Sequence, residues 1–441
     1  MSHRLATFLL FLFVLVIDIQ SLPAQDNPQF IIEQITISGN SKTRPGVIYE
    51  LLPYAVSDTV SESAIHTGID DLRATNMFKH VELQPRAGSQ PGYLLLNIQV
   101  DERHWPTLQF KGGFSELTGW YITPLSINMD NLLGFGNRAS LDLTFGYHVV
   151  DFNINFISPN TFDSDLDLLL RARVRSQEFF YYENREKYSH PVGQAGYFLG
   201  LRPRSGLFRN VFFGWDLYTN IVDSTVTHVE SDAKSTNLPP AIAAYTDSAH
   251  VTSAFSVHLN LDKRDLAYYP RKGWWLGVWY SHATKRVGGT DAFDRVIIDA
   301  RAYQSLGKQI VLAGRIKAGA ISPDAPFYEK MYLGGPNSLR GYEDRSIGPI
   351  GGGDKLLHGG LELRAPITPR HYPNHFITAV LFVDGGTNLL TNEYLNEDNI
   401  FGSYGFGFRF RLPFIRMLRM DFAYPMNGDP GMVQFSIGQT F

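Results

Sequence analysis

Residues 404–412 have the sequence YGFGFRFRL, in which every second side chain is apolar. Successive side chains of a β-strand point to opposite faces, so three phenylalanines would share one face and Arg409 and Arg411 the other. Aromatic rings suit contact with lipid, whereas arginines inside a strand suit a water-filled lumen. The stretch therefore predicts one strand in the wall of a membrane β-barrel.

The same alternation continues through the chain from about residue 105 to the C-terminus. Such segments lie near residues 106, 120, 138, 150, 165, 193, 208, 251, 273, 294, 308, 356, 376, 402, 416 and 432. Strands of about ten residues, joined by short turns and longer loops, would fill this length. We expect an all-β membrane barrel of about sixteen antiparallel strands at residues 105–441, enclosing an aqueous lumen. A large soluble β-sandwich is the alternative, because its strands also alternate.

A small domain with helical periodicity precedes the barrel segments. Residues 30–40 (FIIEQITISGN) alternate as a strand, and residues 60–78 have the Ser61 cap and the apolar stripe of a helix. A short helix lies between them, and two strands, KHVELQPR and YLLLNIQVDE, follow. The order β-α-α-β-β predicts one small α+β domain at residues 28–102.

The N-terminus has the layout of a secretory signal peptide. Arg4 is followed by an apolar run at residues 5–17 and by the small residue Ala24, and the run is too short for a membrane-spanning helix. We expect residues 1–24 to be removed, with an N-terminal membrane anchor as the alternative. The chain contains no Cys, which excludes disulfides, a thiol nucleophile and a lipid-modified cysteine.

Net charge and composition limit both the partners that the chain can bind and the class of protein to which it belongs. A net charge of −4 argues against electrostatic capture of nucleic acid. The chain holds 31 Phe, 22 Tyr and 40 Gly, a composition more typical of a membrane barrel than of a helical enzyme.

Motifs that would carry enzymatic chemistry are weak. GPIGGGDK, at residues 348–355, lacks the Ser or Thr of a phosphate-binding loop and predicts a flexible loop. His371 and His375 fall in a predicted turn, and the aspartates of DSDLD, at residues 163–167, leave calcium binding open as an alternative. No G-x-S-x-G or H-E-x-x-H motif is present. We expect neither an enzyme nor a bound cofactor or metal.

Residues 321–354 form the one long connection between late strands, and they contain SLRGY at residues 338–342. On the residues alone, RGY fits an ordinary turn, and Asp384 of LFVDGG would cap a hairpin. The other possibility is that Arg340 enters the lumen and pairs with an inward carboxylate. A second long polar stretch, at residues 222–248, predicts a mobile surface loop.

Several motifs together resemble one family. The small domain, with GN after its first strand, resembles a POTRA domain. The barrel resembles that of the BamA/TamA outer-membrane assembly superfamily, the bacterial surface antigen family. The marks are SLRGY, LFVDGG (381–386), LDKRDLAYYPRKG (261–273), LELRAPI (361–367) and a last strand that closes on Phe441. The resemblance covers essentially the whole mature chain.

The resemblance implies a loop that folds back into the barrel. In the family, the arginine of RGY pairs with the aspartate of F-x-D-x-G on the barrel wall. The corresponding anchor residues here are Arg340, Gly341, Tyr342, Asp384 and Gly386. A bidentate arginine–carboxylate pair in a partly dehydrated lumen would pin the loop.

The resemblance also implies an activity: insertion of barrel proteins into the outer membrane, or translocation of polypeptides across it. The family uses a weak seam between the first and last strands, here with Gly112, Gly113, Phe435, Gly438 and Phe441. An unpaired edge there would template an incoming strand.

Partners follow from the same resemblance. The POTRA domain, in the periplasm, would capture a substrate strand along an exposed edge, with Val81, Glu82 and Leu83 as candidates. An inner, fully paired position for that strand is the alternative. Expected partners are outer-membrane lipid, unfolded outer-membrane or secreted polypeptides and accessory assembly proteins. The chain has room for one POTRA domain where the best-known members have several, which puts docking to accessory proteins in doubt. A passive porin or receptor is the alternative function.

Overall fold

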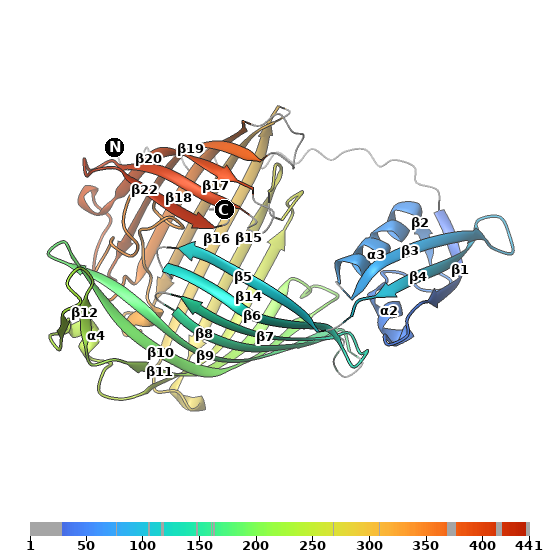
Figure 1. The fold of residues 1–441 in the computed structure, drawn as a ribbon, viewed down its shortest axis with the longest axis horizontal. Coiled ribbons are helices and arrows are strands. Elements are labelled where there is room, and N and C mark those ends of the chain that lie inside the picture. Colours follow the sequence, from blue (N-terminus) through green and yellow to red (C-terminus); the bar gives the residue numbers. More distant parts are fainter. Residues whose placement is uncertain are drawn as a thin grey trace.

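The computed structural model contains a barrel with a small domain, in blue, beyond one of its ends (Figure 1). It describes residues 29–437 apart from 76, 105, 116–118, 147–148, 160, 162–163, 268, 308, 368–375 and 412–416. The predicted signal peptide, Asp163, both turn histidines, Gly438 and Phe441 lie outside the described residues. No described helix is long and apolar enough to span a membrane.

The small domain is a four-stranded sheet covered by two helices. Its elements are β1 (Gln29–Ser38), α2 (Pro45–Leu51), β2 (Thr59–Ser61), α3 (Glu62–Ala74), β3 (Phe78–Ala87) and β4 (Tyr93–Glu102). The sheet order is β2-β1-β4-β3, with β1 and β4 parallel and the other pairs antiparallel. The Ser61 hydroxyl accepts a hydrogen bond from Ala64 N and begins α3. Ile69 and Leu72 of α3 are buried against Ile32 and Ile98 of the sheet. The predicted order holds, with the short β2 added.

Sixteen strands form the barrel wall within the described residues, as the alternation predicts. They are β5 (Thr107–Ser115), β6 (Gly119–Leu132), β7 (Asn137–Gly146), β8 (Val149–Ser158), β9 (Leu166–Glu183), β10 (Glu186–Pro203), β11 (Val211–Val222), β14 (His250–Asp262), β15 (Gly273–Ala283), β16 (Phe293–Leu306), β17 (Ile310–Ile321), β18 (Lys355–Pro366), β19 (Ile377–Leu389), β20 (Phe401–Phe410), β21 (Leu418–Pro425) and β22 (Met432–Ile437). The sheet closes where β22 meets β5. The prediction of an all-β barrel after a small α+β domain is confirmed.

The faces of the wall follow the predicted alternation, but part of the lumen is not aqueous. On β20, Phe406 is 40% exposed on the outside, whereas Arg409 is 1% exposed on the inside. Arg419 and Asp421 of β21 are fully buried as well. The expectation of water around these strand-centre charges is therefore wrong here. The loop of residues 322–354, between β17 and β18, packs against them.

The two stretches expected to be flexible form a packed cap. Residues 222–248 contain β12 (Val226–His228), β13 (Lys234–Ser235) and α4 (Pro240–Ala243), where a mobile surface loop was expected. Val226 and Ile242 are buried against Phe327 of the long loop, which belongs to the 3-10 turn η3 (Phe327–Glu329). Gly353 is buried, and the buried Asp354 pairs with Lys330 at 2.9 Å. The flexible-loop interpretation of GPIGGGDK is therefore wrong too.

Candidate functional site

The candidate site is the contact between the long loop and the inner wall of the barrel. Arg340 is fully buried there. Its Nε and Nη2 donate to the two carboxylate oxygens of Asp384 at 2.6 and 2.8 Å, and its Nη1 donates to Glu362 Oε1 at 2.6 Å. The guanidinium carbon also lies 3.6 Å from the ring centre of Phe382. Two carboxylates and an aromatic face thus fix one loop arginine.

A wider set of buried charges surrounds this pair, and we call it the luminal charge network. Its members, all at most 3% exposed, are Arg340, Glu362, Arg364, Asp384, Arg409, Arg419 and Asp421. Arg409 donates to Glu362 at 3.1 Å and to Asp421 at 2.7 Å. Arg364 donates to Glu362 at 2.8 Å. Because each charge has an opposite partner, the network can exist without bulk water.

Glycines on neighbouring strands make room for the carboxylates. Gly360 of β18 pairs with Asp384 of β19, and a Cβ on Gly360 would lie 2.4 Å from Asp384 Oδ1. Likewise Gly407 of β20 pairs with Asp421 of β21, and a Cβ there would lie 2.2 Å from Asp421 Oδ1. Sequence reasoning missed these glycines and most of the network, because the register that aligns them is not visible in one strand.

The other predicted anchor residues lie around Arg340. Gly341 has a left-handed backbone (φ 86°), which favours glycine. The Tyr342 hydroxyl donates to Gly402 O on β20 at 3.0 Å. A Cβ on Gly386 would lie 2.8 Å from Leu357 O and 3.2 Å from the buried Leu333 side chain of the loop. Glycine at that position therefore lets the loop approach β19 closely.

A second buried ion pair holds the loop to another part of the wall. Glu329 of η3 is 8% exposed and accepts from Arg295 Nη1 of β16 at 2.5 Å. The Tyr218 hydroxyl of β11 donates to the same carboxylate. Buried ion pairs therefore hold the loop to two parts of the wall, and sequence reasoning missed the second pair because nothing marks Glu329 as inward.

The LDKRDLAYYPRKG stretch forms the turn between β14 and β15. A Cβ on Gly273 (φ 96°) would lie 2.1 Å from Lys263 O, so glycine is required where the turn rejoins β15. Asp265 Oδ1 accepts from the backbone N of Arg271 at 2.9 Å. This fold carries the Tyr269 hydroxyl to within 2.6 Å of Thr378 Oγ1 on β19, the strand that also holds Asp384.

Comparison with known proteins identifies the barrel. The model of the Omp85 superfamily domain matches residues 131–441. The chain belongs to the Omp85 superfamily. It is 25% identical over 433 residues to the outer membrane protein assembly factor BamA of Nitratidesulfovibrio vulgaris, covering 93% of this chain and 51% of that protein. It is 22% identical to the sorting and assembly machinery component 50 homolog of Bos taurus, covering 94% of this chain and 91% of that one.

The fold comparison agrees with the family. The crystal structure of BamA from Haemophilus ducreyi lacking POTRA domains 1–3 superposes with a TM-score of 0.68 at 19% identity, covering 93% of this chain and 84% of that one. The present chain spans about half the length of the Nitratidesulfovibrio relative. This Omp85 protein is an outer-membrane barrel preceded by a small α+β domain.

The predicted seam residues that the structure describes lie on β5 and β22. Gly112 and Gly113 of β5 pair with Ile122 and Tyr121 of β6. Phe435 of β22 is 43% exposed and lies on the lipid side of the wall. These predicted seam residues therefore belong to the two strands that meet at the closure.

The candidate capture strand β3 is an edge strand, which decides between the two positions left open by the sequence. Val81 is buried and Leu83 packs against the core, whereas Glu82 is exposed. Arg73 of α3 donates from Nη2 to Val81 O at 2.8 Å. One outward backbone carbonyl of the edge is therefore already occupied, and Leu83 offers the next outward backbone groups, two residues along.

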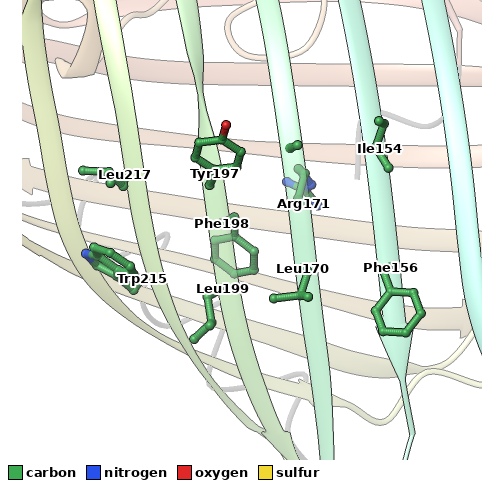
Figure 2. A pocket seen from close by; sticks show the side chains of 10 residues that line it. Ile154, Phe156, Leu170, Arg171, Tyr197, Phe198, Leu199, Trp215 and Leu217 are labelled. Atoms are coloured by element: carbon green, nitrogen blue, oxygen red, sulfur yellow. The ribbon is translucent and has the colours of Figure 1, made fainter.

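Hollows and acidic clusters elsewhere do not add a catalytic centre. An apolar hollow of about 430 Å³ crosses strands β8 to β11 (Figure 2). Its lining is Ile154, Phe156, Leu170, Arg171, Ala172, Tyr197, Phe198, Leu199, Trp215 and Leu217. The described residues contain no group of three potential metal ligands. Asp167 pairs with Arg202 at 2.5 Å, and Asp165 accepts from Ser205 at 2.6 Å.

Proposed function

We propose that this protein inserts β-barrel proteins into the outer membrane or moves polypeptides across it, acting through the seam between β22 and β5. The single observation that carries the proposal is the loop fixed inside the lumen by Arg340. A loop bonded to β18 and β19 through a fully buried arginine occupies space that a passive channel would leave free. That observation favours seam opening over the alternative, a passive porin or receptor.

The small domain would deliver the substrate as an extended strand. Strand β3 offers an edge for β-augmentation, in which main-chain hydrogen bonds supply affinity. Because Arg73 occupies the carbonyl of Val81, capture would begin at Leu83 and continue toward the β3–β4 turn. The protein would need no catalytic group, since strand pairing and burial in lipid drive the process. Accessory assembly proteins would dock on the same domain.

Strand capture can be tested by photo-crosslinking in cells. A photoreactive residue at Glu82, on the exposed side of β3, should trap unfolded outer-membrane polypeptides. The matched control is Gln99 on β4, which is also exposed but pairs with Ser38 of β1 on one side and with Glu82 of β3 on the other. Equal yields at the two positions would contradict capture at the β3 edge.

Depletion in the native host, followed by outer-membrane proteomics, tests the function as a whole. Broad loss of barrel proteins supports assembly, and loss of one exported protein supports dedicated translocation. An unchanged profile would reject both and leave the porin or receptor as the better explanation.

A further inference from the structure

The long loop contacts the last strand of the barrel through the side chain of Gln434. Gln434 of β22 is 1% exposed and points into the lumen. Its Oε1 accepts from Gly341 N at 3.1 Å, and its Nε2 donates to Tyr342 O at 2.8 Å. The side-chain amide thus satisfies one backbone donor and one backbone acceptor directly after Arg340, much as a neighbouring strand would.

A second contact lies two residues further along β22, on the same face of the strand. Ser436 is also 1% exposed, and its hydroxyl lies 3.3 Å from Asn337 Oδ1 of the loop. The same Asn337 oxygen accepts from Arg419 of β21 at 2.8 Å. The luminal face of β22 is therefore bonded to residues 336–342 of the loop, while Val433 and Phe435 face lipid.

The contacts of the loop are distributed unevenly around the barrel. Within the part of the chain that the structure describes, polar contacts of the loop fall on β9 to β11, on Asp291 before β16, and on β16 to β22. The last strand, β22, therefore belongs to the part of the wall that the loop holds.

We propose that Gln434 is a positioning residue that ties the last strand to the anchored loop and keeps β22 in place at the seam. The role of this contact at the seam rests on the proposed function, but the contact between Gln434 and the loop belongs to the folded protein and can be measured without substrate. Arg340 bonds the loop to β18 and β19, and Gln434 bonds the next two residues of the same loop to β22. Loss of the Gln434 amide would leave Gly341 N and Tyr342 O buried without this partner.

A distance measurement across the barrel tests the tie. Spin labels at Ile298→Cys on β16 and Phe435→Cys on β22 would both sit on the lipid side, where each native side chain is 43% exposed. The chain has no other Cys, so labelling is specific. Electron–electron resonance on the full chain in lipid nanodiscs should give one narrow distance distribution in the parent protein.

The variant Gln434→Met keeps the length of the side chain and removes its hydrogen bonds. We expect it to add a second, displaced distance population. The matched control is Gln194→Met on β10, because Gln194 bonds across the wall to Asn220 at 3.1 Å and not to the loop. The control should keep the parent distribution. A parent-like distribution in Gln434→Met, or equal broadening in both variants, would overturn the proposal.

A cross-link keeps the proposal testable if Gln434→Met fails to fold. Asn337→Cys with Ser436→Cys should be joined by a short bifunctional reagent in the otherwise unsubstituted protein. Absence of that cross-link would refute the contact between the loop and β22. Both measurements use purified protein without substrate. An unchanged outer-membrane proteome after depletion would therefore reject the proposed function but not the contact between Gln434 and the loop. Failure of the distance or cross-link measurement would reject that contact but not the proposed function.

Discussion

Two parts of the inner wall carry similar residues but bury them differently. The anchored wall, the luminal faces of β18–β21, holds the luminal charge network, and its Arg409 side chain is fully buried. The open wall, the luminal faces of β6–β9, also alternates polar side chains inward, but its Arg173 side chain is 30% exposed beside Asp151. The long loop touches the first wall through Arg340, and it reaches the second at Tyr182 of β9, which donates to Glu343. The described arginines that are at most 2% exposed therefore lie on the loop or on the wall that it covers.

This difference in burial changes how much each ion pair contributes to the free energy of unfolding. An exposed ion pair contributes little, because water competes for both groups and side-chain entropy is lost. In the anchored wall, water is excluded, so removing one partner leaves an uncompensated buried charge. The four predictions that follow test whether the effect of losing a charge tracks contact with the loop.

The largest effect is expected for Arg340→Met. The substitution leaves Asp384 and Glu362 buried with fewer partners, and breaking a buried pair in this way costs about 3–5 kcal/mol. The temperature at which the folded barrel disappears from unheated-versus-heated gels, at a fixed heating time, should fall markedly. The loop should also become sensitive to protease. A variant that keeps the unfolding temperature and the protease resistance of the parent would contradict the anchored wall.

The barrel itself could be predicted from sequence, because alternation is local. YGFGFRFRL predicts a strand with Arg409 inside, and that placement is what the structure contains. The burial of Arg409 could not be predicted, because it depends on a loop about seventy residues earlier in the chain. The role of Gly360 opposite Asp384 depends on register between two strands, which turns and long-range pairing decide.

The second effect tests the other attachment of the loop. Glu329→Gln removes the charge that balances Arg295 and keeps the shape of the side chain. The free energy of unfolding should therefore fall by about 1.5–3 kcal/mol. The matched control is Glu343→Gln, because Glu343 is on the same loop but its side chain is 54% exposed, 3.6 Å from Lys187. The control should change stability by less than about 1 kcal/mol. Equal losses for the two variants would show that burial does not set the effect.

The third effect concerns residues 41–43 of the small domain, which the Glu102 carboxylate holds by hydrogen bonds. Glu102 accepts from Ser41 Oγ at 2.7 Å and from Thr43 N at 2.6 Å, and Thr43 in turn accepts from Asn131 of β6 at 2.7 Å. Partial burial acts to raise the pKa of Glu102, but its hydrogen bonds from Thr43, Ser41 and Lys42 outweigh it and lower the pKa. A lowered folded pKa gives stability that is present above the unfolded pKa and is lost as pH falls through the folded value.

Hydrogen exchange of the amides in residues 41–43 measures that stability. Glu102→Gln should increase exchange at neutral pH, corresponding to about 1 kcal/mol, because water competes at this site. The difference between the variant and the parent should shrink as pH falls below the ordinary glutamate pKa and vanish below the lowered pKa of Glu102 in the folded protein. Glu82→Gln, at an exposed position of the same domain, is the matched control and should match the parent throughout. A pH-independent difference would assign the effect to shape rather than to charge.

The smallest effect is expected on the open wall. Arg171 of β9 is exposed, and its Nε donates to Asn155 Oδ1 at 2.8 Å. Arg171→Met should change the free energy of unfolding by less than about 0.5 kcal/mol, since water can replace the arginine at Asn155. Gel-based unfolding under the conditions used for Arg340→Met makes the two arginines directly comparable. A loss as large as that of Arg340→Met would mean that inward position alone, without the loop, is enough to make an arginine essential.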